Sequence, residues 1–107
     1  MLNGSDVLQS YAEGALRSVV RNGDTFGYPL MLNATIAGAV ALEIQRLETT
    51  YRDKIAESIG GRVVNHQMTD EGPSGLVFFD RPIPSPDIIV RAVKDAMEQT
   101  GLHVVEV

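Results

Sequence analysis

The side chains best suited to chemistry in this sequence are its two histidines, His66 and His103, and the acids near them. A metal site needs three or four ligands, and the nearest further candidates are Asp70, Glu71 and Glu106. His66 falls on an apolar face of a predicted strand, where a histidine is more often a hydrogen-bonded structural residue than a ligand. The same interpretation holds for His103, so we predict no metal and no cofactor.

Nucleophilic catalysis has little support in the sequence. Ser74 or Ser85 could be combined on paper with a histidine and an acid, but no Gly-x-Ser-x-Gly motif is present to expose a serine. Ser85 is better explained as a helix cap, because Pro86 and Asp87 follow it. The glycine-rich turn at 72–75 lacks the lysine and the helix of a phosphate-binding loop, and its proline removes one amide. We therefore assign no catalytic residue and favour a non-enzymatic function.

Composition restricts the class of protein further. The chain has 107 residues, a net charge of −5 and no cysteine. An acidic chain opposes non-specific contact with phosphate backbones, and the lack of cysteine excludes disulfides and thiolate metal sites. No apolar run is long enough to span a bilayer, and no basic region precedes an apolar one at the N-terminus. We expect a cytoplasmic protein that binds neither nucleic acid nor membrane.

The first part of the chain, residues 1–32, is predicted to be a helix and a connection. Paired apolar residues recur every four positions over 6–21, which is typical of an amphipathic helix. Asn22-Gly23 is expected to end that helix, and Gly14 within it indicates close packing or a tolerated flaw. Residues 24–32 read as a connection that either closes the end of the helical layer or contacts a partner.

A long helix is predicted from Asn33 to Gly60. Its roughly 26 helical residues would run about 39 Å at about 1.5 Å per residue, which is longer than the roughly 34 Å width of a compact chain of this size. Glu48 and Arg52 form a favourable pair four residues apart within it. The helix would therefore overhang or pack on a second protomer. Its apolar stripe is Ala37, Val40, Ile44, Leu47, Tyr51 and Ile55.

Residues 33–107 are predicted to combine this helix with a ββαβ unit. Strands are expected over 62–68, 76–79 and 102–107, and a helix from Pro86 to Gly101. The whole chain, 1–107, is thus predicted to be a single α+β domain. It would have two layers, the order α-α-β-β-α-β, a small three-stranded mixed sheet and one long helix.

From residue 34 onward the element order resembles that of small KH-type and BolA-type domains, and the sequence at residues 101–104 also resembles them. The resemblance implies a similar topology. The Gly-x-x-Gly sequence at 72–75 lies between predicted strands, whereas the nucleic-acid loop of KH domains joins two helices. No functional residue is carried over, because topology alone does not imply activity.

Exposed apolar surface gives the leading functional prediction. Phe78 and Phe79 must point to opposite faces of the sheet, so one of them needs cover from the first helix or from another subunit. We predict a non-enzymatic protein–protein interaction or assembly module, associating with itself or another protein. The alternatives are a small-ligand or regulatory domain, and an enzyme whose site is shared between subunits and uses His66, Arg81 or Asp87. The predicted interaction residues are Phe26, Tyr28, Leu30, Met31, Phe78, Phe79 and Arg81.

Overall fold

The computed structural model describes residues 4–32, 41–69 and 72–101. This part of the chain is an α+β domain with three helices and a four-stranded antiparallel sheet in the order β1-β2-β4-β3. The elements follow the chain as α1 (Gly4–Arg17), β1 (Val20–Asn22), β2 (Thr25–Pro29), α3 (Ala41–Ser58), β3 (Val63–Thr69), β4 (Gly72–Phe79) and α4 (Pro86–Gln99).

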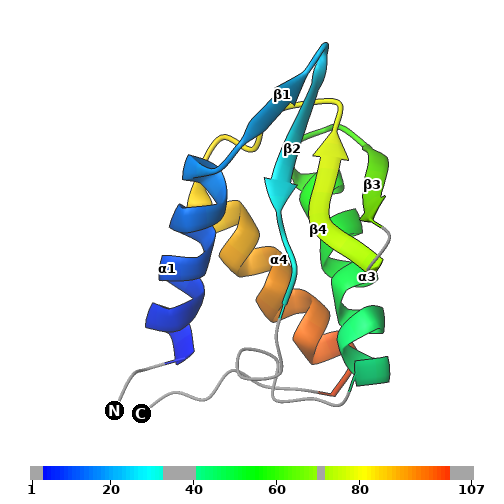
Figure 1. The fold of residues 1–107 in the computed structure, drawn as a ribbon. Helices are drawn as coiled ribbons and strands as arrows, with labels where there is room; N and C mark the ends of the chain where they lie inside the picture. Colours follow the sequence, from blue (N-terminus) through cyan, green and yellow to red (C-terminus); the bar gives the residue numbers. More distant parts are fainter. Residues whose placement is uncertain (1–3, 33–40, 70–71, 102–107) are drawn as a thin grey trace.

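The helices form one layer and the sheet the other, with α4 lying between α1 and α3 (Figure 1). Buried side chains of all three helices belong to a single core with one face of the sheet. The sheet contributes Tyr28, Val77 and Phe79 to that core. The predicted two-layer α+β class is therefore correct, whereas the predicted element order α-α-β-β-α-β and the three-stranded mixed sheet are not.

The element order differs from the prediction because β1 and β2 form a hairpin where a helix end and a connection were expected. The helix predicted over 6–21 ends at Arg17, and its expected last turn is strand β1. Asn22 pairs with Thr25, which makes Gly23 the first central residue of a two-residue turn, with φ +62°. Positive φ at that position is what a type II′ hairpin turn requires. The predicted connection is thus largely strand β2.

The long helix is described from Ala41 onward. Its 18 residues span about 27 Å at 1.5 Å per residue, which is shorter than the 42 Å longest dimension of the molecule. Residues 33–40 of the predicted helix lie outside the described residues. Within the described part the stripe prediction is confirmed, because Leu47, Tyr51 and Ile55 are fully buried. The described length of α3 supplies no overhang that would require a second protomer.

The second half of the chain follows the prediction more closely. Strand β4 begins at Gly72, so most of the predicted loop before Leu76 is strand paired with β3. Helix α4 begins after Ser85 in extended conformation with a proline in its first turn, as the Ser-Pro-Asp sequence predicts. The Ser85 side chain, which was expected to cap the helix, makes no cap hydrogen bond. The predicted final strand, 102–107, lies outside the described residues. The buried face of α4 is Ile89, Ala92, Val93, Ala96 and Met97.

Candidate functional site

The two faces of the sheet differ sharply in their surroundings. Phe26 lies opposite Phe79, and Tyr28 lies opposite Val77, on the face that the helices cover. The rings of Tyr28 and Phe79 are tilted at 59° with centroids 6.2 Å apart. Because side chains alternate along a strand, the residues between these positions point to the other face. Among the described elements, no helix packs on that side.

We call this second side the helix-free face. Val20 pairs with Gly27 and Gly27 with Phe78, which forms a row across β1, β2 and β4. The alternation continues past β2, since Leu30 and Leu32 are buried and Met31 between them is 50% exposed. The residues that β1, β2, β4 and the segment after β2 contribute to this face are uncharged. They are Val20, Asn22, Thr25, Gly27, Pro29, Met31, Leu76 and Phe78.

Phe78 and Phe79 point to opposite faces, as the sequence predicts. Phe79 is fully buried in the core, whereas Phe78 stands apart from that core and is 8% exposed. The Phe78 ring lies over Gly27, where a methyl group would come within 2.6 Å of Phe78 Cε1. Both rings are thus enclosed within one chain. The expectation that one of them needs cover from the first helix or from another subunit is therefore not met.

The predicted interaction residues divide into buried and exposed groups. Tyr28 and Leu30 are buried, and the Tyr28 hydroxyl accepts a hydrogen bond of 2.9 Å from the Ile83 amide. Phe26 is half-buried, with the Arg21 guanidinium 5.2 Å from its ring centroid. Of the predicted set, Met31 and Arg81 are exposed.

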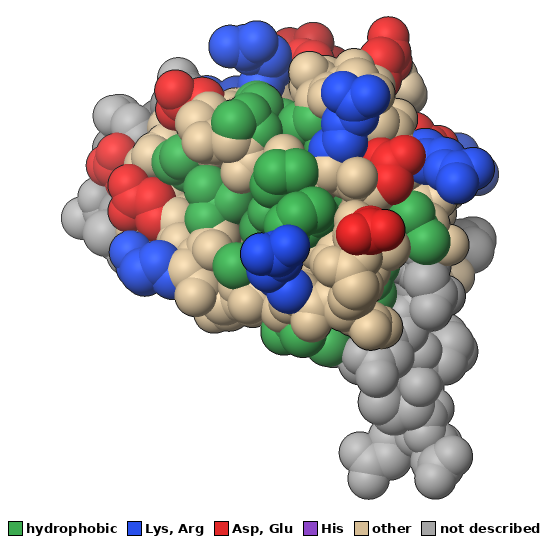
Figure 2. Space-filling model, turned by 90° about the horizontal axis from the view of Figure 1, so that it is seen from above, with side chains coloured by type: hydrophobic (Ala, Val, Ile, Leu, Met, Phe, Trp, Pro, Cys, Tyr) green, Lys and Arg blue, Asp and Glu red, His purple; other side chains and the backbone are tan. Residues whose placement is uncertain are grey.

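Two exposed residues at the start of the hairpin were not among the predicted interaction residues. Val19 and Val20, 40% and 44% exposed, were predicted to lie on the apolar side of a helix. They belong to the junction of α1 and β1, below the tip of the β1–β2 hairpin (Figure 1). Seen from above, hydrophobic side chains gather at the centre of the surface with charged side chains around them (Figure 2). The aromatic alternation Phe26-Gly27-Tyr28 was the sequence signal for the hairpin.

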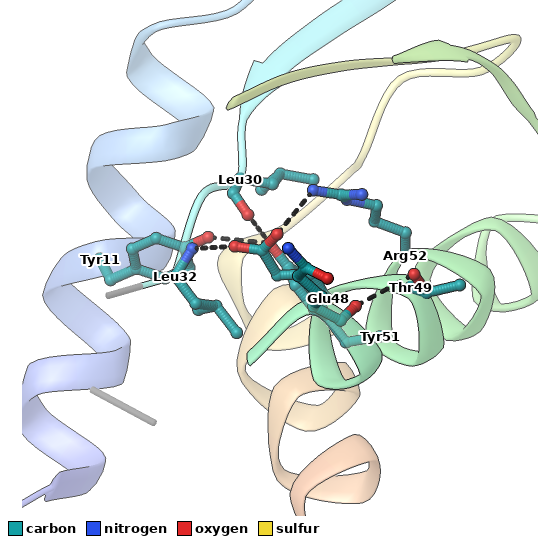
Figure 3. Close-up of polar contacts among 8 residues, drawn as sticks. Tyr11, Leu30, Leu32, Glu48, Thr49, Tyr51 and Arg52 are labelled. Carbon is teal, nitrogen blue, oxygen red and sulfur yellow. Dashed lines mark hydrogen bonds and ion pairs between the residues drawn. The ribbon is translucent and has the colours of Figure 1, made fainter. Parts of the chain in front are cut away.

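A largely buried polar network joins Tyr11 and helix α3 to Leu30 and Leu32 (Figure 3). The Tyr51 hydroxyl of α3 donates to the Leu30 carbonyl oxygen, and the Tyr11 and Tyr51 hydroxyl oxygens are 3.0 Å apart. A phenol has one hydrogen to donate, so Tyr11 donates to Tyr51. Burial raises the pKa of both phenols well above the ordinary value of 10.0, which keeps both neutral.

Glu48, one turn before Tyr51 in α3, completes the network. Its Oε1 accepts the Leu32 amide at 2.7 Å, and its Oε2 lies 3.1 Å from Arg52 Nη2. The Glu48–Arg52 pair predicted from the spacing is therefore present. The spacing did not predict that the pair is buried. The side chains of Glu48 and Arg52 are only 13% and 11% exposed. If one partner moves away, the other is left as an unpaired buried charge, which is energetically costly. The pair therefore keeps a defined geometry.

Most of the side chains considered for catalysis or metal binding lie outside those that the structure describes. Arg81 and Asp87 are exposed, the structure describes only the backbone of His66, and His103 lies outside the described residues. In residues 4–32, 41–69 and 72–101, no group of three or more His, Cys, Asp or Glu side chains could hold a metal ion. None of the helices described is both long and apolar enough to cross a membrane.

Comparison with known proteins returned no matching family model, no matching curated protein and no matching solved structure.

Proposed function

We propose that this protein is a non-enzymatic protein–protein interaction or assembly module that associates through the helix-free face, with a second copy of the chain as the expected partner. The observation that carries the proposal is the position of Val20 and Met31. Both are large apolar side chains about half exposed. Val20 lies in the row that Gly27 and Phe78 share, and Met31 follows β2 and lies against Gly75 of β4.

The neutral character of the face supports a protein partner. Burying a charged side chain costs several kcal/mol unless it is paired, whereas apolar area is covered with a gain of about 25 cal/mol per Å². Since the residues that β1, β2, β4 and the segment after β2 contribute to the face are uncharged, a partner can cover them without that cost.

The polar network fixes the position of the segment that carries Met31. It holds the segment that carries Met31 by hydrogen bonds from α3, so the exposed thioether stands on an ordered support. An ordered surface loses less conformational entropy when a partner binds it.

The experiment that tests this function is light scattering during gel filtration over a range of concentrations. Wild-type protein is expected to form a larger species as concentration rises, and Val20→Asp is expected to remain monomeric. Ser10→Asp, which adds the same charge at an exposed position of α1, is the matched control and should associate like the wild type. A wild-type chain that stays monomeric at every concentration and binds no protein would contradict the proposal.

A further inference from the structure

The segment Leu30–Leu32, here called the strap, is anchored on two sides. The Leu30 amide donates to the Gly75 carbonyl oxygen of β4 at 2.7 Å, and the Leu30 carbonyl oxygen accepts from Tyr51. The Leu32 amide donates to Glu48. The sheet therefore holds the beginning of the strap, and α3 holds both of its ends.

Met31 occupies the middle of the strap and points away from these anchors. Its neighbours Leu30 and Leu32 are 0% and 3% exposed, whereas Met31 is 50% exposed. The Met31 side chain lies across Gly75, close enough that a Cβ atom on Gly75 would come within 3.0 Å of Met31 Cβ. The anchors on either side thus fix where the Met31 side chain stands on the helix-free face.

We propose that Tyr51 and Glu48 are positioning residues for the interaction surface, because through the strap they hold Met31 in its place on the helix-free face. The proposal rests on the proposed function for its effect on association. It goes beyond that function by assigning a role to two side chains that do not belong to the surface.

The hydrogen-bond directions explain why these two residues act together. Tyr11 donates to Tyr51, and Tyr51 donates to Leu30, so a chain of hydroxyl groups runs from α1 to the strap. Such chains strengthen each member by polarisation. Glu48 uses one oxygen for the strap and the other for Arg52, so its carboxylate is fixed from both sides. Both anchors are partly or fully buried, where competition from water is weak.

The test uses full-length variants that keep side-chain volume. Tyr51→Phe removes the donor to Leu30, and Glu48→Gln removes the charge that Arg52 and the strap share. Thr49→Val is the matched control, because it removes a side-chain hydrogen bond of 3.1 Å to the Gln45 carbonyl oxygen on an exposed part of the same helix. The readouts are the methyl resonance of Met31, one of four methionines, and amide exchange at Leu32.

Both Tyr51→Phe and Glu48→Gln are expected to shift the Met31 methyl resonance and to speed Leu32 exchange about tenfold or more, while Thr49→Val changes neither. Each should also weaken association about fivefold in the wild-type background and less than about twofold in a Met31→Ala background, since coupled residues are non-additive. Tyr11→Phe, which leaves the Tyr51 donor intact, gives a milder form of the same change if Tyr51→Phe folds poorly.

Two results would overturn the proposal. One is an unchanged Met31 resonance in both variants, and the other is equal weakening of association with and without Met31. A wild-type chain that never associates would instead overturn the proposed function. The Met31 and Leu32 readouts would then decide on their own whether Tyr51 and Glu48 hold the strap.

Discussion

Phe78 and Gly27 face each other across β4 and β2, and the ring occupies the space that a Gly27 side chain would need, 2.6 Å from Phe78 Cε1. Gly27→Ala should therefore lower the free energy of unfolding by about 1–3 kcal/mol, the usual cost of overpacking. The measurement is urea unfolding.

The same substitution in a Phe78→Ala background should change sign. Without the ring there is no clash, and alanine loses less backbone entropy than glycine in a strand, by about 0.5–1 kcal/mol. Equal destabilisation in both backgrounds would show that the ring does not cause the effect.

Tyr51→Phe should cost about 1–3 kcal/mol of stability, because it leaves the buried Leu30 carbonyl oxygen and the Tyr11 hydroxyl without their partner. Tyr11→Phe removes only the outer donor and should cost less, about 1 kcal/mol. Thermal unfolding of the two variants under identical conditions provides the comparison. A larger loss for Tyr11→Phe would contradict the hydrogen-bond direction assigned to the pair.

Alkaline pH should destabilise the fold through the same two phenols. Burial raises their pKa in the folded protein above the ordinary value of 10.0, which applies to the unfolded chain. The unfolded state therefore loses protons first as pH rises above about 10, and stability falls by up to about 1.4 kcal/mol per pH unit for each phenol. Below that pH the stabilisation is fully present. The measurement is denaturant unfolding from neutral to strongly alkaline pH.

The control for this pH dependence is the variant that carries both Tyr11→Phe and Tyr51→Phe. Its free energy of unfolding is lower at neutral pH, but it should decrease less than that of the wild type as the pH is raised. A slope as steep as that of the wild type would assign the alkaline loss to other groups.

Alanine substitutions at Gly14 and Gly75 should change the stability of the protein in opposite directions. Gly14 lies in α1 with nothing within 4 Å of an added Cβ, so Gly14→Ala should raise stability by about 0.5–1 kcal/mol. Gly75 has φ +82° and lies against Met31, so Gly75→Ala should lower stability by about 1–3 kcal/mol. Calorimetric unfolding of both variants tests this contrast, and a gain in stability at Gly75 would contradict the packing of Met31 on β4.

Local sequence signals explain which elements could be predicted. Helix α4 carries a start signal at Ser85-Pro86 and an apolar face of helical period, and both agree with the structure. Asn22-Gly23 is different, because a helix end and a tight hairpin turn both use a residue with positive φ. The apolar pair Val19-Val20 continues the four-residue pattern of α1, which favoured the wrong alternative.

Long-range contacts explain what the sequence could not reveal about the site. Glu48 and Arg52 are recognisable as a helical pair, but their burial depends on the strap, which precedes them by 16 residues at the Leu32–Glu48 contact. Tyr51 reads as one more apolar position of its stripe, and its bond to Leu30 follows only from the position of α3 beside the strap. Met31 was predicted together with Phe26, Tyr28 and Leu30 as an apolar residue of a connection, and Tyr28 and Leu30 proved to be buried. Val20 was instead placed within a helical pattern.

The most direct test of the central claim locates the surface that association covers. The chain has no cysteine, so Met31→Cys and Ser10→Cys each introduce a single thiol, one on the helix-free face and one on exposed α1. The measurement is the rate of thiol alkylation over a range of protein concentrations. The proposed association predicts that the Met31→Cys thiol reacts more slowly as concentration rises, while the Ser10→Cys thiol keeps its rate. A Met31→Cys rate that is the same at every concentration, or an equal slowing of both thiols, would contradict association through the helix-free face.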